Sequence, residues 1–346
     1  MKIELLGLSF SVLEADDIHQ KVLLEFARDP LSALVYGCYA KYPQLAERTI
    51  KALNRSFSMA ATYGQVTLSY LHKEGANFPE YNERLLTCPI SFSSFEAWAL
   101  IQVAQEAERE FLQACLTPNN EVQLTGQLIQ LLTLKSKIIQ NRYSDYLLDL
   151  GAQLNVKKLE LQVQNRERET GGDFALLFEW RDIDKNLRVC PVIFQAKRSV
   201  GVDVDISQKG SNSESQLAVL SRSKCNPSYI FYNCDSQGSL SEPRLPTVKR
   251  VRDVTGTGSR TSSIQDSLSL SIFVLDIMAG NSYFVASSRR EALNAILPGV
   301  EERELASITT FSSDPSALPN YKSEYALYLS IKSKHNLGRD SNDLGR

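Results

Sequence analysis

Two apolar segments joined by a short charged turn constrain this chain most. Almost every side chain from Asp173 to Trp180 is apolar, and a second apolar run covers residues 189–194. An apolar run without polar alternation is typical of a strand that is buried on both faces. The charged residues 181–188 between the runs include the Asp and Asn side chains that suit a hairpin loop. The sequence therefore predicts two neighbouring core strands, although Pro191 is more typical of strand starts and edges.

Polar side chains stand at one end of each predicted strand. Asp173 follows a pair of glycines and opens the first strand, while the second strand ends in Gln195-Ala196-Lys197-Arg198. Side chains two positions apart in a strand share a face, so Gln195 and Lys197 point the same way. A charge on a core strand needs a partner or a function. We therefore predict that Asp173, Gln195 and Lys197 form a functional cluster.

The composition narrows the class of protein without naming a function. The chain has 346 residues, of which 43% are hydrophobic and 23% charged, as expected for a globular protein of about two domains. The net charge of −2 means that nucleic-acid binding would need a local basic patch. The six cysteines lack metal-ligand spacing, which favours buried, reduced thiols. We expect no membrane span, no signal peptide and a cytoplasmic location.

The periodicity of apolar residues predicts two regions of different structure. An all-helical domain is expected over residues 1–125, because apolar residues there recur every three or four positions. A further helix is predicted over residues 121–140, and it either ends there or runs on to Leu154. Residues 126–333 are expected to form an α/β domain with a mixed sheet flanked by helices, which makes the chain α+β overall. Its remaining predicted elements are strands at 157–163 and 228–234, helices at 213–223 and 288–297, a strand or buried run at 268–279, and a disordered tail over residues 334–346.

The predicted cluster has the chemistry of a magnesium site. Asp173 offers a carboxylate and Gln195 an amide oxygen, and the backbone carbonyl of Ala196 is a further oxygen. Mg²⁺ prefers oxygen ligands and keeps several waters, so one or two carboxylates suffice. The Lys197 ammonium can then orient a water molecule or stabilise charge that develops on a phosphate.

This arrangement resembles the PD-(D/E)xK nuclease superfamily over about residues 140–235. GGDFALLF matches the strand that begins with Asp, and PVIFQAKR matches the next strand in the Gln-x-Lys form of the branch with Mrr-like restriction enzymes. The resemblance implies a restriction-endonuclease-like fold and an endonuclease that uses Mg²⁺ or Mn²⁺ to hydrolyse DNA. It also implies a setting in bacterial restriction or antiviral defence, with a homodimer or a defence-system protein as partner.

The resemblance calls for one more acidic residue, and the sequence offers several. We favour Glu169, because a sharp bend at the two glycines would bring it beside Asp173. Asp145 is the alternative, since the superfamily often carries an acid on the helix before the first strand; Asp149 and Glu167 compete with these two. Each of these acids is equally well interpreted as a solvated surface carboxylate. Gln195 in place of an acid removes one negative charge, which favours one metal ion over two.

Basic residues around the cluster are candidates for contacts with DNA. Arg198 ends the second strand, and a predicted long mobile loop over residues 235–263 carries Lys249, Arg250 and Arg252. Gln216 is a further candidate, either for the catalytic site or for the DNA backbone, although Ser213-x-x-Gln216 also has the spacing of a helix capping box.

A non-catalytic scaffold that binds nucleic acid or a protein is the competing function. In that interpretation Asp173 caps a bend, and Lys197 reaches solvent from the end of a strand.

Overall fold

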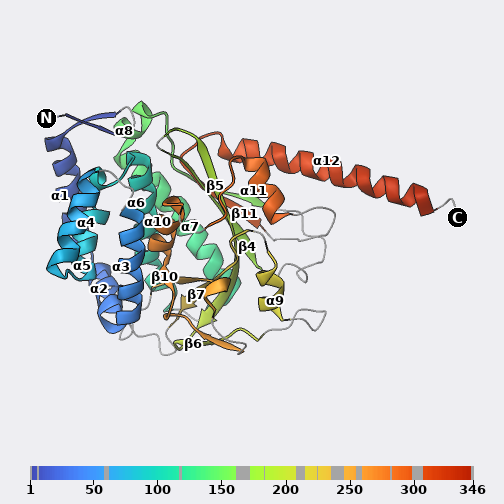
Figure 1. Ribbon diagram of the computed structural model, residues 1–346, viewed down its shortest axis with the longest axis horizontal. Helices are drawn as coiled ribbons and strands as arrows, with labels where there is room; N and C mark the ends of the chain where they lie inside the picture. Colours follow the sequence, from blue (N-terminus) through green and yellow to red (C-terminus); the bar gives the residue numbers. More distant parts are fainter. Residues whose placement is uncertain are drawn as a thin grey trace.

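The computed structural model describes most of the chain. The described residues are 2–5, 8–57, 62–116, 119–160, 172–182, 184–207, 215–223, 225–234, 245–254, 259–280, 283–297 and 307–343. They form an α+β structure in which an N-terminal helical region is followed by a mixed sheet with flanking helices (Figure 1).

The N-terminal region is helical, as the apolar periodicity predicted. After a hairpin of β1 and β2 the chain is helical, and capping side chains mark two of the helix starts: Asp29 caps α2, and the Ser94 hydroxyl accepts the Ala97 N–H at 3.1 Å at the start of α6. The elements are β1 (Lys2–Leu5), β2 (Leu8–Ser11), α1 (Val12–Arg28), α2 (Pro30–Lys41), α3 (Pro43–Phe57), α4 (Thr62–Glu74), α5 (Phe78–Tyr81), η1 (Asn82–Leu86), η2 (Pro89–Ser91) and α6 (Phe95–Ala114).

The main sheet has seven strands in the order β10-β8-β7-β5-β4-β11-β3. The two predicted core strands are its central hairpin, in which β4 pairs antiparallel with β5 and Phe174 lies opposite Phe194. β5 then pairs parallel with β7. The strands are β3 (Asn155–Glu160), β4 (Phe174–Arg181), β5 (Leu187–Ser199), β7 (Ser228–Asn233), β8 (Thr247–Arg250), β10 (Leu268–Ser269) and β11 (Ser307–Ser312), and β6 (Asp203–Asp205) pairs separately with β9 (Arg260–Ser262).

Pro191 is accommodated inside β5 because of where β7 begins. The Pro191 carbonyl accepts the Asn226 N–H at 3.2 Å on the flank that faces β7. The nitrogen of a strand residue points to the same flank as its carbonyl, and the pairing of β7 with β5 starts only at Phe194. The missing N–H of Pro191 therefore breaks no bond of the ladder.

Helices cover both faces of the sheet and create two cores. Phe174, Leu176 and Phe178 belong to the core with α6, α7 (Glu121–Arg142) and α10 (Leu270–Met278). Ala175 and Leu177 belong to the other core, with α11 (Arg289–Ile296) and α12 (Ala317–Asp343). The alternation of side chains along β4 explains why nearly the whole strand is buried. The first core continues into the N-terminal helices, and residue 125 lies inside α7.

Three predicted segments are resolved in more detail by the structure. Of the two alternatives for 268–279, the buried run is confirmed: β10 has only two residues, and the buried helix α10 follows it. The helix that starts at residue 121 ends at Arg142, which confirms the shorter of its two predicted lengths, and the short helix α8 (Ser144–Asp149) follows. The segment 235–263, predicted to be a loop, contains β8, the short helix η3 (Val251–Asp253) and β9.

The C-terminal segment also differs from its prediction. α12 continues to Asp343, where the sequence predicted a disordered tail from residue 334. Its first turns pack Ala317 and Tyr321 into the second core, and the helix then extends away from the body (Figure 1).

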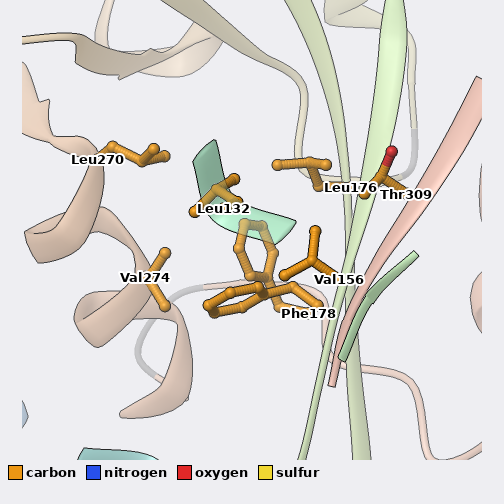
Figure 2. Close-up of a pocket in the computed structure, with 8 residues that line it drawn as sticks. Leu132, Val156, Leu176, Phe178, Leu270, Val274 and Thr309 are labelled. Atoms are coloured by element: carbon orange, nitrogen blue, oxygen red, sulfur yellow. The ribbon is translucent and has the colours of Figure 1, made fainter. Parts of the chain in front are cut away.

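The space between α10 and the sheet contains a small apolar cavity of about 10 Å³. Leu270 and Val274 of α10 line it together with Leu176 and Phe178 of β4 (Figure 2). A cavity of this size holds about one water molecule at most, so it is no substrate site. None of the described helices has the length and apolar character required to cross a bilayer.

Candidate functional site

Asp173 and Gln195 are in direct contact at one end of the central hairpin. Gln195 donates from Nε2 to Asp173 Oδ2 at 2.8 Å, and the Ala196 N–H donates to the same oxygen at 2.8 Å. The Asp173 N–H in turn donates to the Phe194 carbonyl at 2.8 Å, which extends the ladder between β4 and β5. The structure thus brings together the aspartate and the amide that the sequence predicted to be neighbours.

A glycine permits the close approach of the two strands at this point. A Cβ atom on Gly172 would collide with the Ile193 side chain and would also lie 3.3 Å from the Phe194 carbonyl oxygen. Only a residue without a side chain lets the chain enter β4 this close to β5. Gly172 therefore helps to set the position of Asp173.

Lys197 lies on the Gln195 face of β5 and is only 3% exposed. Burial lowers the pKa of its ammonium group, while the carboxylates of Glu121, Asp173 and Asp205 raise it. The buried cation is thus stabilised by three surrounding acids rather than by solvent. This differs from a lysine that extends its charge into water.

Asp173 is exposed as a residue, yet protein atoms crowd its carboxylate. This desolvation raises the pKa of Asp173, and the Glu121 charge acts in the same direction. The Ala196 N–H, the Lys197 ammonium and the Gln195 amide lower the pKa. Because the residue is open to solvent, water screens these effects and we expect the shift to be modest.

Glu121 is the acid of this site that sequence reasoning missed. It is the first residue of α7, where the Asn120 side chain accepts the Gln123 N–H at 2.9 Å in a capping box. Its Oε1 accepts the Arg198 N–H at 2.9 Å, next to Lys197. In the sequence it resembled any acid in a first helical turn. The signal available was the resemblance itself, which implies an acid on the helix before the first strand.

Of the acids that the sequence offered, Asp145 and Asp149 lie on a helix far from the site. Asp145 is exposed on α8, and the 22 residues of α7 separate that helix from Glu121, a distance of roughly 30 Å along the helix axis. Asp149 belongs to the same short helix. Glu167 and Glu169 lie outside the described residues, so Glu169 remains a prediction.

Part of the predicted basic loop is the strand β8, and Lys249 on it is not available for DNA. Lys249 lies on β8, is 3% exposed, and donates from Nζ to Thr261 Oγ1 at 3.0 Å and to the Ser262 carbonyl at 3.3 Å. Its burial follows from the pairing of β8 with β7 and β10, a non-local contact that the polar composition of the segment concealed. Arg250 pairs with Asp253 at 3.1 Å, and Arg252 is exposed on η3.

The two remaining candidates have different outcomes. Arg198 lies beside the site, and its Nε is buried without a hydrogen-bond partner among the described residues. Gln216 starts α9 (Gln216–Ser221), whose cap is Ser215, with its hydroxyl accepting the Ala218 N–H at 3.2 Å. The predicted cap, Ser213, and the Gln216 side chain lie outside what the structure describes.

The donor atoms at this site suit a hard cation. Two carboxylates, Glu121 and Asp173, are combined with Gln195, whose Oε1 is buried without a hydrogen-bond partner among the described residues. A buried acceptor without a partner is costly, and a cation beside it would satisfy it. Across the described ranges no group of three or more His, Cys, Asp or Glu side chains forms a metal site. Oxygen donors such as these carboxylates and this amide would suit Mg²⁺ or Mn²⁺, which retain several waters.

No protein-family model, curated protein or solved structure matches this chain. The function of the site is therefore inferred from its own geometry and chemistry.

Proposed function

We propose that this chain is a metal-dependent endonuclease that hydrolyses DNA phosphodiester bonds. One observation carries the proposal: the hydrogen bonds from Gln195 and Ala196 to Asp173 place an acid and an amide on the strand end that bears the buried Lys197. Two carboxylates, an amide oxygen and an ammonium group in one place are the groups that hydrolysis of a phosphate ester requires.

The order of elements around the site supports the same proposal. α7, β3, β4, β5, α9 and β7 occur in this order along the chain, with the short helix α8 after α7 and the short strand β6 after β5. This is the order in which the resemblance to the PD-(D/E)xK superfamily places its acid, its Asp strand and its Gln-x-Lys strand. One feature differs from this order: β3 and β4 are consecutive in the chain, but β11 lies between them in the sheet. We also propose that the nuclease acts in bacterial restriction or antiviral defence, as the resemblance implies.

Each residue has a defined role in the proposed reaction. A bound Mg²⁺ or Mn²⁺ would polarise the phosphate and lower the pKa of the attacking water. Two donated hydrogen bonds hold Asp173 Oδ2, so we assign Oδ1 to the cation, together with Glu121 and Gln195 Oε1. Lys197 orients the water and stabilises charge on the phosphate. Because Gln195 is neutral, we propose one metal ion rather than two.

A specific observation favours the alternative of a non-catalytic scaffold. The Gln195 amide already supplies Asp173 with a hydrogen bond, so the pair is stable without a cation. Such a pair could simply join β4 to β5. The scaffold would then bind nucleic acid or a protein without cleaving it.

The test compares cleavage of plasmid DNA, single-stranded DNA and RNA in Mg²⁺ and in Mn²⁺. Asp173→Ala and Lys197→Met are compared with the wild type and with two controls at exposed positions, Asp184→Ala and Lys73→Met. We expect at least a hundredfold loss of DNA cleavage in the first two variants and wild-type cleavage in both controls. Thermal unfolding of every variant separates a lost activity from a lost fold.

Two outcomes would contradict the nuclease. Equal cleavage by all five proteins would mean that Asp173 and Lys197 do not perform the reaction. Binding of DNA by the wild type without any cleavage would favour the scaffold.

A further inference from the structure

A second pocket, with a volume of about 390 Å³, opens where α9, the start of β7 and η3 meet. It shares no lining residue with the site at Asp173. Its volume lies in the range of pockets that hold small organic ligands. The lining combines hydroxyls, two arginines and one aromatic ring: Ser221, Ser223, Asn226, Arg250, Arg252 and Phe284.

Two arginines, Arg250 and Arg252, form one side of this pocket. Asp253 Oδ2 faces two guanidinium groups, Arg250 at 3.1 Å and Arg48 at 3.2 Å, and Arg252 lines the same pocket. The Arg250 guanidinium also lies over the Tyr283 ring, with 4.9 Å between its central carbon and the ring centroid. Arg250 is thus held in place, but its Nη1 is buried without a hydrogen-bond partner among the described residues. An anion with several acceptor oxygens would satisfy this group.

The aromatic side of the pocket is the ring of Phe284, which is exposed to solvent on a backbone that is held in place. Phe284 is 36% exposed. Asn226 holds its backbone at both ends: Nδ2 donates to the Phe284 carbonyl at 2.9 Å, and Oδ1 accepts the Phe284 N–H at 2.8 Å. Asn226 also donates to the Pro191 carbonyl at 2.9 Å, which ties this loop to β5. An exposed ring on a held backbone is a suitable surface for stacking a planar group.

The two serines provide polar atoms of a different kind. The Ser221 hydroxyl donates to the Leu217 carbonyl at 2.6 Å, so it presents acceptor lone pairs to the pocket. Ser223 Oγ lies 2.9 Å from Cys225 Sγ. Such hydroxyls can bond the hydroxyl groups of a sugar.

We propose that this pocket binds a nucleotide, with its phosphate at Arg250 and Arg252 and its base stacked on Phe284. The Asn226 amide is committed to backbone groups and reads no base edge, so the pocket accepts different bases with similar affinity. The nucleotide is either free or part of a strand. The inference does not depend on the nuclease, because it involves none of the residues assigned to that reaction.

Calorimetric titration of the full chain with AMP, adenosine and inorganic phosphate tests the chemistry. We expect AMP to bind at least tenfold more tightly than either of its parts, because the phosphate and the base have separate contacts. Phosphate that binds as tightly as AMP would overturn the role of Phe284, and no binding of AMP would overturn the proposal. Competition with a five-residue oligothymidylate identifies the source: displacement of AMP indicates a strand, and no displacement a free nucleotide.

Variants of the two sides of the pocket locate the binding. Arg252→Gln and Phe284→Ala are each expected to weaken AMP binding about tenfold. Arg290→Gln and Tyr63→Ala, which remove an exposed arginine and an exposed aromatic ring elsewhere, are the matched controls and should bind as the wild type does. Equal affinity in all four variants would overturn the proposal. Asp173→Ala should retain full AMP affinity, so failure of the nuclease and failure of this pocket are distinguishable.

Discussion

Glu121 Oε1 accepts the backbone N–H of Arg198 at 2.9 Å, although 77 residues separate the two in the sequence. The bond joins the first turn of α7 to the end of β5, directly beside Lys197. It holds an acid next to the aspartate and the amide of the hairpin. The candidate site is therefore built by three elements, and only two of them are neighbours in the chain.

The first prediction concerns which acid binds the cation. Glu121→Gln keeps an acceptor for the Arg198 N–H but removes a charge, so we expect Mn²⁺ affinity to fall at least tenfold. Asp145→Asn should leave the affinity unchanged, because that residue lies on α8 at the far end of α7. Calorimetric titration with Mn²⁺ measures both. Loss of affinity in Asp145→Asn, or in Glu169→Gln with Glu121→Gln unaffected, would assign the acid differently.

Gln195→Glu should make the stability of the fold sensitive to a cation. The new carboxylate would be buried beside Asp173 and would replace a hydrogen-bond donor by a like charge. We expect about 1–3 kcal/mol of destabilisation at neutral pH without metal. Mn²⁺ should then raise the melting temperature of this variant by more than it raises that of the wild type. Scanning calorimetry measures both melting temperatures. If Mn²⁺ raises the melting temperature of the variant and of the wild type equally, no cation binds at this position.

A buried ion pair between Glu179 and Arg289 should be a major determinant of stability. Arg289 donates to the two Glu179 oxygens at 2.8 and 2.7 Å, and the Tyr321 hydroxyl donates to Glu179 at 2.9 Å. Arg289→Met leaves a buried charge without its cation, so we expect a loss of about 3–5 kcal/mol in the free energy of unfolding. Urea denaturation measures it.

The neighbouring arginine supplies the control for that experiment. Arg290→Met, at an exposed position, should change the unfolding free energy by less than about 0.5 kcal/mol. Adding Glu179→Gln to Arg289→Met should recover part of the loss, since it removes the stranded charge. A double variant no more stable than the single one would contradict the electrostatic cause.

Glu108 should make stability fall as the pH rises. Burial between α6 and α10 raises its pKa to about 7, although Ser271 donates to the carboxylate from its N–H at 2.8 Å and from its hydroxyl at 2.6 Å. Between the unfolded pKa of about 4.5 and the folded pKa of about 7, the folded state binds more protons than the unfolded state. The free energy of unfolding therefore decreases across this window, by on the order of 2–3 kcal/mol.

A neutral variant isolates this contribution. Glu108→Gln retains partners for both Ser271 groups and does not titrate, so it should lack this part of the pH dependence. Urea denaturation of both proteins at pH 5 and pH 7.5 measures how much unfolding free energy each protein loses between these pH values. If the two proteins lose the same stability between these pH values, Glu108 is not the cause.

The part of the site that the sequence predicted depends on local pattern. Apolar runs identified β4 and β5, and the two-residue period placed Gln195 and Lys197 on one face. The short turn between the strands made their pairing the simplest expectation, and with it the contact between Gln195 and Asp173. The helices up to α6 followed from the same kind of local evidence.

The other parts were decided by contacts between distant segments. Glu121 joined the site because α7 packs across the sheet with its first turn at the end of β5, and Lys249 was buried because β7 and β10 pair with its segment on both sides. Periodicity reports which side chains of one segment share a face. It contains no information on which other segment will cover that face, since packing between remote elements sets that choice.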